Sequence, residues 1–283
     1  MFLIIGGNSE IGSATAGFIR ARGADALTTT RRPVLERSEI PLNFSSPICD
    51  FKIPECVTSA CVCVAVARLT ACQADPKGSA DVNVRQTLAL IDTFVRRGVY
   101  TLFLSSNQVF SGFAAHTPPG APLSPVSEYG RQKAEVEHVL QQRMTTGAPI
   151  GVLRLAKVVS PGMPLIKTWI SELIAERPIK AFTDMTMAPV PIDIVAKSIM
   201  HMMEDRLPII AQLSGPRDVA YSDIGDFLAK RIGVDPSLVR PISALESGMP
   251  EGATPSHTTL DSSYILERYG LAVPDAFDVI DKL

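Results

Sequence analysis

In the first half of the chain, short apolar segments rich in β-branched residues alternate with longer amphipathic segments. Strands that alternate with helices are typical of β-α-β units, in which each helix crosses over a parallel sheet. The expected strands are residues 2–5, 26–30, 47–51, 60–67, 100–105 and 150–155. The expected helices are residues 11–22, 80–97 and 128–143. This pattern predicts an α/β fold of the Rossmann type, with a doubly wound parallel sheet of six strands.

Charge and hydropathy exclude several classes of protein. The 27 Lys and Arg residues nearly balance the 29 Asp and Glu residues, so the chain lacks the basic surface that binds nucleic acid or anionic lipid. The longest strongly apolar run, residues 60–67, is far shorter than the about 20 residues that cross a membrane. The first residues also lack the basic segment of a secretory signal. We therefore expect a cytoplasmic protein with neither a nucleic-acid partner nor a membrane partner.

The cysteines are odd in number and cluster in one quarter of the chain, in apolar or helix-like surroundings. They are Cys49, Cys56, Cys61, Cys63 and Cys72. This distribution favours reduced core residues over a disulfide framework. No pair has the spacing of zinc ligands, so no metal site is expected.

A glycine-rich segment, Gly6-Gly7-Asn8-Ser9-Glu10-Ile11-Gly12, connects the first expected strand to the first expected helix. Glycines at such a turn let backbone amides approach a pyrophosphate, and the helix N-terminus favours negative charge. A plain glycine-rich turn is the alternative, because Ser9 or Glu10 stands where the usual middle glycine would be. The loop residues expected to bind a dinucleotide are Gly6, Asn8, Ser9, Glu10, Ile11 and Gly12.

The second half of the chain has a different character, with prolines that interrupt short amphipathic segments. Helices are expected at residues 165–176, 192–204 and 221–232. We expect residues 1–156 to form the dinucleotide-binding domain and residues 157–283 to form mainly a smaller, substrate-binding lobe. Segments around 179–212 are expected to return to the sheet.

Two arginines, Arg31 and Arg32, follow the second expected strand. An enzyme selective for NAD would place an acidic residue there to bind the ribose 2′-hydroxyl, whereas guanidinium groups suit a 2′-phosphate. A solvated basic loop is the alternative. The arginines favour NADPH or NADP as the cofactor, with NAD as the alternative.

Further along the chain, a serine, a tyrosine and a lysine are suited to proton transfer. Ser106 lies at the carboxyl end of an expected strand, and Tyr129 and Lys133 are four residues apart at the start of an expected helix. This spacing places the phenol and the ammonium on one helix face. A nearby cation lowers a phenol pKa toward working pH, which suits a general acid or base. The alternatives are a surface helix residue for Tyr129 and a strand-end cap for Ser106.

Taken in order, these motifs resemble those of the extended short-chain dehydrogenases/reductases over nearly the whole chain. The further matching motifs are Asp50-Phe51, Asn83-Val84, Ser105-Ser106-x-x-Val109-Phe110, Leu153-Arg154-Leu155, Ser160-Pro161-Gly162 and Pro191-Ile192-Asp193-Ile194-Val195. Within that group the chain is most similar to the dTDP-4-dehydrorhamnose reductase branch. The motifs that carry this looser similarity are Ala67-x-x-Thr70-Ala71, Leu213-Ser214-Gly215 and Pro255-x-x-x-x-Leu260-Asp261.

The resemblance implies a role for each residue of the reaction site. Tyr129 would donate a proton to a substrate carbonyl while NADPH supplies hydride, Lys133 would bind the nicotinamide ribose, and Ser106 would hydrogen-bond the carbonyl. It also implies a cofactor site to which the following residues contribute: Asp50 and Phe51 beside the adenine, Ala65 and Ala67 beside the fourth strand, and Asn83. The resemblance further implies a nucleotide-sugar substrate and makes a homodimer plausible.

Substrate-binding residues are harder to assign, because the chain departs from the family in its second half. Candidates are Asn107, Gln108, Lys157, Arg217 and His257. Asn107 and Gln108 follow Ser106 where a dehydratase would carry Asp-Glu, which favours reduction or epimerisation. An NAD-dependent epimerase and a non-catalytic, NADP-binding regulatory subunit are the alternatives to a keto-sugar reductase.

Overall fold

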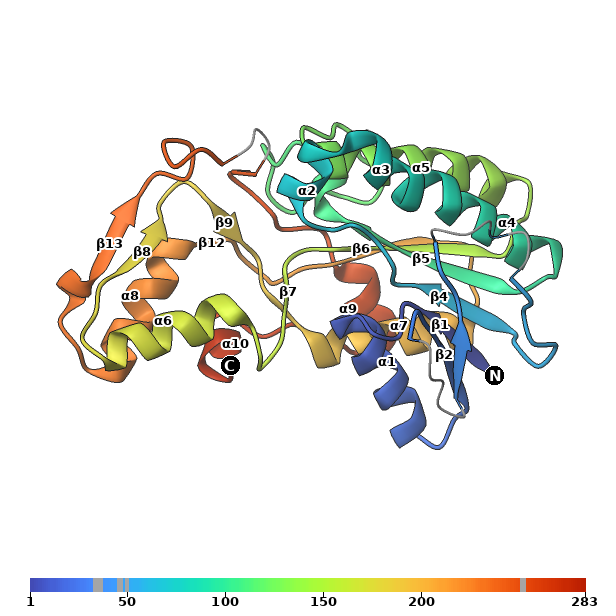
Figure 1. Ribbon diagram of the computed structural model, residues 1–283, viewed down its shortest axis with the longest axis horizontal. Helices are drawn as coiled ribbons and strands as arrows, with labels where there is room; N and C mark the ends of the chain where they lie inside the picture. The colour runs from blue at the N-terminus through green and yellow to red at the C-terminus, as the bar shows by residue number, and fades with distance from the viewer. Residues whose placement is uncertain (33–37, 45–47, 49–50, 250–252) are drawn as a thin grey trace.

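A parallel sheet of seven strands forms the centre of the larger domain in the computed structural model, which describes residues 1–32, 38–44, 48, 51–249 and 253–283 (Figure 1). The strand order is β11-β6-β5-β4-β1-β2-β3, and every neighbouring pair is parallel. The strands are β1 (Phe2–Ile5), β2 (Ala26–Thr30), β3 (Glu39–Pro41), β4 (Ser59–Val62), β5 (Tyr100–Ser106), β6 (Ile150–Leu155) and β11 (Ile210–Leu213).

The predicted doubly wound α/β fold is confirmed, but three strands differ from the sequence-based expectation. The third strand is the short β3, and not residues 47–51, of which 47, 49 and 50 lie outside the described residues while Ile48 and Phe51 are not in a strand. The seventh strand, β11, is additional to the six expected; it pairs with β6 and lies at the end of the region around 179–212 that was expected to return to the sheet. Strand β4 ends at Val62, five residues before the predicted end. These strands have only three or four residues each, too few to show a period in the sequence.

Helices cover both faces of the sheet, as Figure 1 shows. On one face, α1 (Glu10–Ala21), α7 (Ile192–Asp205) and α9 (Ser263–Tyr269) pack against the sheet. On the other face lie α4 (Thr87–Arg96) and α5 (Glu128–Thr145). A π-helical turn, Asp81–Gln86, precedes α4 where one continuous helix was predicted. The short helices α2 (Leu69–Ala74) and α3 (Pro76–Ala80) come just before it.

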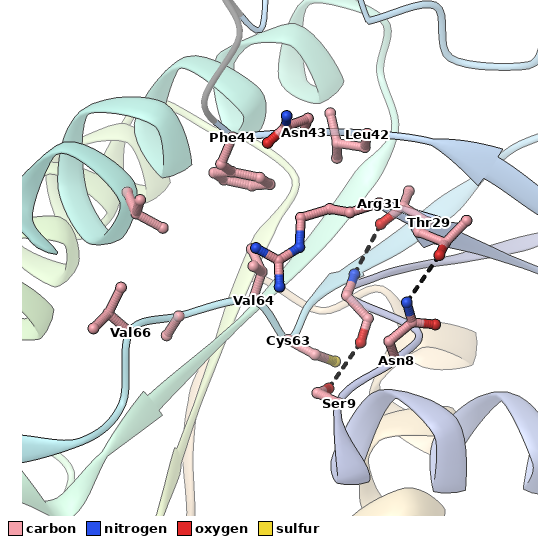
Figure 2. Close-up of a pocket in the computed structure, with 14 residues that line it drawn as sticks. Asn8, Ser9, Thr29, Arg31, Leu42, Asn43, Phe44, Cys63, Val64 and Val66 are labelled. Atoms are coloured by element: carbon pink, nitrogen blue, oxygen red, sulfur yellow. Dashed lines mark hydrogen bonds between the residues drawn. The ribbon is translucent and has the colours of Figure 1, made fainter. Parts of the chain in front are cut away.

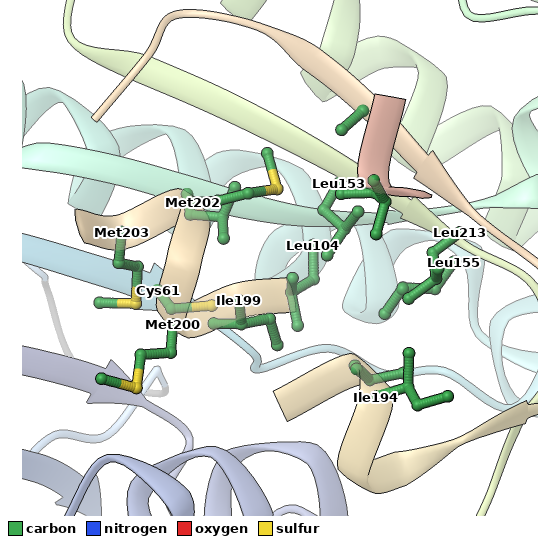
Figure 3. Packing of buried hydrophobic residues seen from close by; sticks show 14 of the residues in the cluster. Cys61, Leu104, Leu153, Leu155, Ile194, Ile199, Met200, Met202, Met203 and Leu213 are labelled. Carbon is green, nitrogen blue, oxygen red and sulfur yellow. The ribbon is translucent and has the colours of Figure 1, made fainter. Parts of the chain in front are cut away.

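The core beneath α7 is rich in sulfur-containing side chains (Figure 3). Met200, Met202 and Met203 of α7 are buried together with Cys61 of β4 and Leu104 of β5. Flexible thioethers fill the irregular space between a helix and a twisted sheet. Met200, Met202 and Met203 are therefore packing residues of this core.

The remaining elements form a smaller lobe with a core of its own, in which Trp169 packs edge-on against Tyr221. Its helices are α6 (Pro164–Ile174), α8 (Tyr221–Ile232) and α10 (Ala276–Asp281). Its two-stranded sheets pair β8 (Ile179–Phe182) with β13 (Val239–Ile242), and β9 (Thr186–Met187) with β12 (Val219–Ala220). A further pair, β7 (Val158–Val159) with β10 (Val190–Pro191), lies where the chain passes between the sheet and the lobe. Single 3-10 turns are formed by Asn107–Val109 and Pro236–Leu238.

None of the helices in the described part of the chain is long and apolar enough to cross a membrane.

A buried ion pair joins three elements of the larger domain. Arg154 of β6 donates to both carboxylate oxygens of Glu137 on α5, at 2.7–3.1 Å, and both side chains are at most 1% exposed. The same guanidinium donates to the side chain of Gln212 on β11 (3.0 Å) and to the carbonyl of Pro119 (2.9 Å). Each of the three guanidinium nitrogens therefore has a hydrogen-bond partner that the fold supplies.

We expect Arg154→Leu to lower the free energy of unfolding by about 3–5 kcal/mol, because it leaves the Glu137 carboxylate buried without a cation. Urea unfolding measures the loss. Arg177→Leu is the control, because its ion pair with Glu172 is largely exposed and such pairs contribute little. Equal losses in the two variants would contradict this account of Arg154.

Candidate active site

The glycine-rich loop between β1 and α1 is closed by its own serine. Ser9 is the N-cap of α1, and its hydroxyl accepts a hydrogen bond from the Gly12 amide (3.0 Å) and donates to the Gly6 carbonyl (2.8 Å). Gly6 has a φ of +87°, and a side chain at Gly12 would clash with the Gly6 carbonyl. The serine in the place of a middle glycine thus fixes the loop and leaves it the narrow cradle that a pyrophosphate requires.

A pocket of about 400 Å³, here called the arginine pocket, opens beside this loop (Figure 2). It is lined by Gly6, Asn8, Ser9, Thr29, Thr30, Arg31, Leu42, Asn43, Phe44, Cys63, Val64, Ala65, Val66 and Val82. Figure 2 shows the Arg31 guanidinium reaching into it, between Phe44 and Cys63. Among the residues that the structure describes, no carboxylate forms an ion pair with Arg31. The Arg31 guanidinium therefore offers a positive charge to a ligand in this pocket.

Arg32 turns away from the arginine pocket. It lines a separate hollow of about 230 Å³, together with Gly7, Arg20 and Ser38. The two neighbouring arginines were predicted to act together, but the structure directs only Arg31 at the arginine pocket.

The residues expected beside the adenine are placed differently from the prediction. Asp50 lies outside the described residues. Phe51 packs edge-on against Phe94 in the core, with ring centroids 6.5 Å apart, and does not line either pocket. Asn43 and Phe44, which follow β3, line the arginine pocket instead. The sequence-based assignment missed them because it placed the third strand about eight residues too late.

A second pocket, of about 320 Å³, lies at the carboxyl ends of β4, β5 and β6 and is here called the tyrosine pocket. Its lining residues are Ser9, Glu10, Ile11, Val62, Cys63, Ala65, Ala67, Leu104, Ser105, Ser106, Tyr129, Lys133, Leu155, Ala156 and Val158. Three of these, Ser9, Cys63 and Ala65, also line the arginine pocket. The two pockets are therefore continuous along the edge of the sheet, where ligands bind in folds of this type.

Lys133 is held rigidly below the tyrosine pocket. Its ammonium donates to the Leu104 carbonyl of β5 (2.8 Å) and lies 4.4 Å from the centroid of the Phe103 ring and 5.7 Å from that of Tyr129. Burial lowers the pKa of Lys133 to about 8, and the nearby Glu137 carboxylate opposes this shift. The ammonium thus stays mostly charged at neutral pH, with hydrogen-bond capacity left for a ligand.

Tyr129 differs from the sequence-based expectation in its acidity. Burial, followed by the proximity of Cys72, raises the pKa of Tyr129 above its ordinary value. The expected lowering of this pKa by Lys133 is not found, because burial disfavours the charged phenolate more than the neutral phenol. Tyr129 is therefore a protonated hydroxyl in the tyrosine pocket at neutral pH, which suits a proton donor.

Ser106 ends β5 and is oriented by the turn that follows it. Its hydroxyl accepts a hydrogen bond from the backbone N–H of Gln108 (3.2 Å) and donates one to the side-chain oxygen of Asn107 (3.3 Å). The neighbouring Ser105 hydroxyl is buried and has no hydrogen-bond partner among the described residues, and Ser105 lines the same pocket. A buried polar group left unsatisfied in this way fits a site that a bound molecule completes.

Gln108, predicted to contact substrate, instead supports the helix that carries Tyr129. Its side-chain oxygen accepts a hydrogen bond from Ser127 (3.0 Å), the N-cap of α5, and Ser127 in turn accepts from the Gly130 amide (3.1 Å). Neither Gln108 nor Asn107 lines either pocket. Gln108 thus fixes the first turn of α5 relative to Ser106.

Asn83 likewise acts through the backbone rather than by lining a pocket. Its side chain exchanges two hydrogen bonds with the backbone of Val66 (2.8 and 3.0 Å) and donates to Gln132 on α5 (2.7 Å). It therefore holds the segment after β4, which includes Ala65 and Ala67, in place beside the two pockets.

The three remaining substrate candidates have different surroundings. Lys157 lies between Ala156 and Val158, which line the tyrosine pocket, and partial burial lowers its pKa while Glu10 opposes the shift. Arg217, by contrast, forms a bidentate ion pair with Asp275 (2.6 and 2.9 Å).

His257 also has an internal partner, since its ring Nδ1 lies 3.1 Å from the Asp218 carboxylate. The structure does not bring Arg217 or His257 to either pocket. The sequence could not reveal the partners of Arg217 and His257, because the partner carboxylates are 58 and 39 residues away in sequence.

Within the described ranges, no group of three His, Cys, Asp or Glu side chains is arranged to hold a metal ion. The glycine cradle, the Arg31 cation, Lys133 and the unsatisfied Ser105 hydroxyl instead fit an anionic dinucleotide that extends across both pockets.

Known proteins resemble this chain along most of its length. The family described as RmlD substrate binding domain matches residues 1–278. The chain is also 25% identical over 231 residues to the probable low-salt glycan biosynthesis reductase Agl14 of Haloferax volcanii, which covers 78% of this chain and 75% of that protein.

Two solved structures resemble the whole chain in fold. A hypothetical dTDP-4-dehydrorhamnose reductase from Sulfolobus tokodaii has a TM-score of 0.83 at 15% identity, covering 99% of this chain and 98% of its own. MoeE5, solved in complex with UDP-glucose and NAD, has a TM-score of 0.81 at 18% identity, covering 99% and 96%. Both similarities support the Rossmann-type fold.

We expect Gly12→Ala to lower the free energy of unfolding by about 1–3 kcal/mol, because the new methyl group displaces the Gly6 carbonyl from a packed loop. The same change should weaken dinucleotide binding, measured by the fluorescence of a reduced nicotinamide. Gly17→Ala on the same helix is the matched control, because a methyl group there meets no atom within 4 Å. That variant should raise the free energy of unfolding by about 0.5–1 kcal/mol. Identical behaviour of the two variants would contradict the assignment of the glycine-rich loop as a dinucleotide cradle.

Proposed function

The chain belongs to the RmlD substrate binding domain family, and from this membership we propose that it catalyses the NADPH-dependent reduction of a keto group on a nucleotide-activated sugar. Members of this family and its structural relatives are NAD(P)-dependent oxidoreductases and epimerases of the extended short-chain dehydrogenase/reductase type. The observation that carries the proposal is the meeting of Ser106, Tyr129 and Lys133 in one pocket that continues into the pocket of Arg31.

The proposed reaction assigns one task to each of these side chains. A reduced nicotinamide, when bound, supplies hydride to the carbonyl carbon. The Tyr129 hydroxyl donates its proton to the carbonyl oxygen, which Ser106 also hydrogen-bonds. The Lys133 ammonium, which its hydrogen bond to the Leu104 carbonyl keeps in position, would bind the nicotinamide ribose with its remaining donors.

The protonation state of Tyr129 favours reduction over reactions that begin with loss of a substrate proton. A carbonyl reduction starts with a neutral phenol, whereas oxidation of a sugar hydroxyl, the first step of an epimerase, starts with a phenolate. Since burial raises the pKa of Tyr129, the neutral phenol is the form that this site holds. The neighbouring Asn107 and Gln108 also lack the carboxylates of a dehydratase.

The proposed substrate class rests on the relatives. The curated relative is described as a probable glycan biosynthesis reductase, and MoeE5 was solved with UDP-glucose. The smaller lobe lies next to the carboxyl edge of the sheet (Figure 1), where it can enclose the part of a substrate that extends beyond the tyrosine pocket.

Tyr129→Phe should reduce turnover at least about 100-fold, because the proton donor is lost, while NADPH affinity changes little. Turnover is measured as the loss of nicotinamide absorbance with a panel of 4-keto nucleotide-sugars. Tyr221→Phe is the control, because Tyr221 is buried in the smaller lobe, outside both pockets. Tight NADPH binding without consumption by any sugar of the panel would contradict the reductase, and normal turnover by Tyr129→Phe would remove Tyr129 from its role.

Arg31→Ala should weaken NADPH binding by about 10- to 100-fold and leave NADH binding nearly unchanged, because a charge-assisted hydrogen bond to the 2′-phosphate is lost. Arg32→Ala, which alters the separate hollow, should have a smaller effect. Direct titration of each variant with both cofactors measures the preference. An unchanged ratio of NADPH to NADH affinity in Arg31→Ala would overturn the assignment of NADPH.

A further inference from the structure

Two cysteine side chains are in contact where β4 reaches the pockets. Cys61 lies within β4 and Cys63 follows its last residue, and their sulfur atoms are 3.6 Å apart. Both are free thiols. Two residues apart on an extended segment, they point to the same side of the sheet.

The two thiols differ in their access to the pockets. Cys63 lines both the arginine pocket and the tyrosine pocket, and Figure 2 shows its sulfur directed toward Ser9. Cys61 is fully buried under α7, among the residues drawn in Figure 3. Burial raises the pKa of the Cys61 thiol. Because Cys61 is buried, an oxidant in the pockets can reach it only through Cys63.

The other described cysteines have different surroundings. Cys72 is buried and donates a hydrogen bond to the Val66 carbonyl (3.1 Å), and Cys56 is exposed and lines neither pocket. Of the four cysteines that the structure describes, only Cys63 has both a pocket-facing sulfur and a second sulfur in contact with it.

We propose that Cys61 and Cys63 form an oxidation site, at which a hydroperoxide that enters the pockets converts the two thiols into a disulfide and thereby blocks dinucleotide binding. The Cys63 sulfur attacks one peroxide oxygen and the O–O bond breaks, so that a sulfenic acid forms on Cys63 and the other oxygen leaves as an alcohol, or as water when the oxidant is hydrogen peroxide. The Cys61 thiol then passes its proton to the sulfenic oxygen while its sulfur attacks the Cys63 sulfur, the S–O bond breaks, and that oxygen leaves as water. The two thiols together lose two electrons, and the peroxide gains them.

Disulfide formation must move the wall that the two pockets share. The sulfur atoms have to approach from 3.6 Å to about 2.05 Å. Cys63 is attached to β1 by a hydrogen bond from its amide to the Ile5 carbonyl (2.9 Å), and the next residue, Val64, packs against the Gly6 position. A shift of Cys63 toward Cys61 therefore displaces the floor beneath the glycine-rich loop, which links oxidation to loss of the cofactor.

The test uses the full chain carrying Cys56→Ser, so that the tryptic peptide of residues 53–68 contains only Cys61 and Cys63. The protein is treated with hydrogen peroxide, remaining thiols are alkylated, and the peptide is weighed by mass spectrometry. We expect this peptide to lose two hydrogens and to escape alkylation, and dithiothreitol to reverse both changes. Saturation with the nicotinamide dinucleotide that the reduced protein binds should slow the oxidation at least about tenfold.

Binding is measured on the same samples by titration with that dinucleotide, and oxidation should weaken it at least about tenfold. In Cys61→Ser, Cys63 should form a sulfenic or sulfinic acid and no disulfide, whereas Cys72→Ser should oxidise like the parent. Full alkylation of both thiols after peroxide treatment would overturn the proposal, as would a disulfide that leaves dinucleotide affinity unchanged. The mass readout does not depend on reductase activity, so its result stands apart from that of the proposed function.

Discussion

The hydrogen bond from the Lys133 ammonium to the Leu104 carbonyl joins the two elements on which the candidate site depends. It crosses from α5 to β5, so the helix that carries Tyr129 is held at a fixed height above the strand that ends in Ser106. The contacts of Gln108 with Ser127 and with Ser106 reinforce the same junction from the other side. Because the strands of the sheet are parallel, the side chains that this junction orients, Tyr129 and Ser106, lie at one edge of the sheet, beside the glycine-rich loop.

Local patterns in the sequence were sufficient to predict the long elements and the residues attached to them. Strands β1, β2, β5 and β6 and helices α1, α5 and α8 lie at or within two residues of their predicted bounds. The glycine-rich loop, Ser106, Tyr129 and Lys133 follow from these elements, since each is placed by a strand end or a helix start. Their common location at one sheet edge is a property of parallel topology and needs no knowledge of side-chain partners.

Properties that depend on distant partners could not be predicted from local patterns. Strand β3 has three residues and is recognisable only through its pairing with β2. Arg217 was assigned to a ligand by its type and its place in a loop, and Asn83 by the family resemblance, yet Asp275 and the Val66 backbone are their partners. The acidity of Tyr129 was misjudged for a similar reason, because helical spacing reveals the nearby lysine and does not reveal how far burial disfavours a charged phenol.

The contribution of the second half of the chain to the sheet has a consequence for how the protein forms. Strand β11 covers the edge of β6, and α7 and α9 cover one face. A nascent chain that ends near residue 156 would therefore expose both an unpaired parallel edge and the apolar face that normally holds the methionines of α7. The first half of the chain thus cannot complete the sheet by itself, and completion must wait until residues far into the second half have been synthesised.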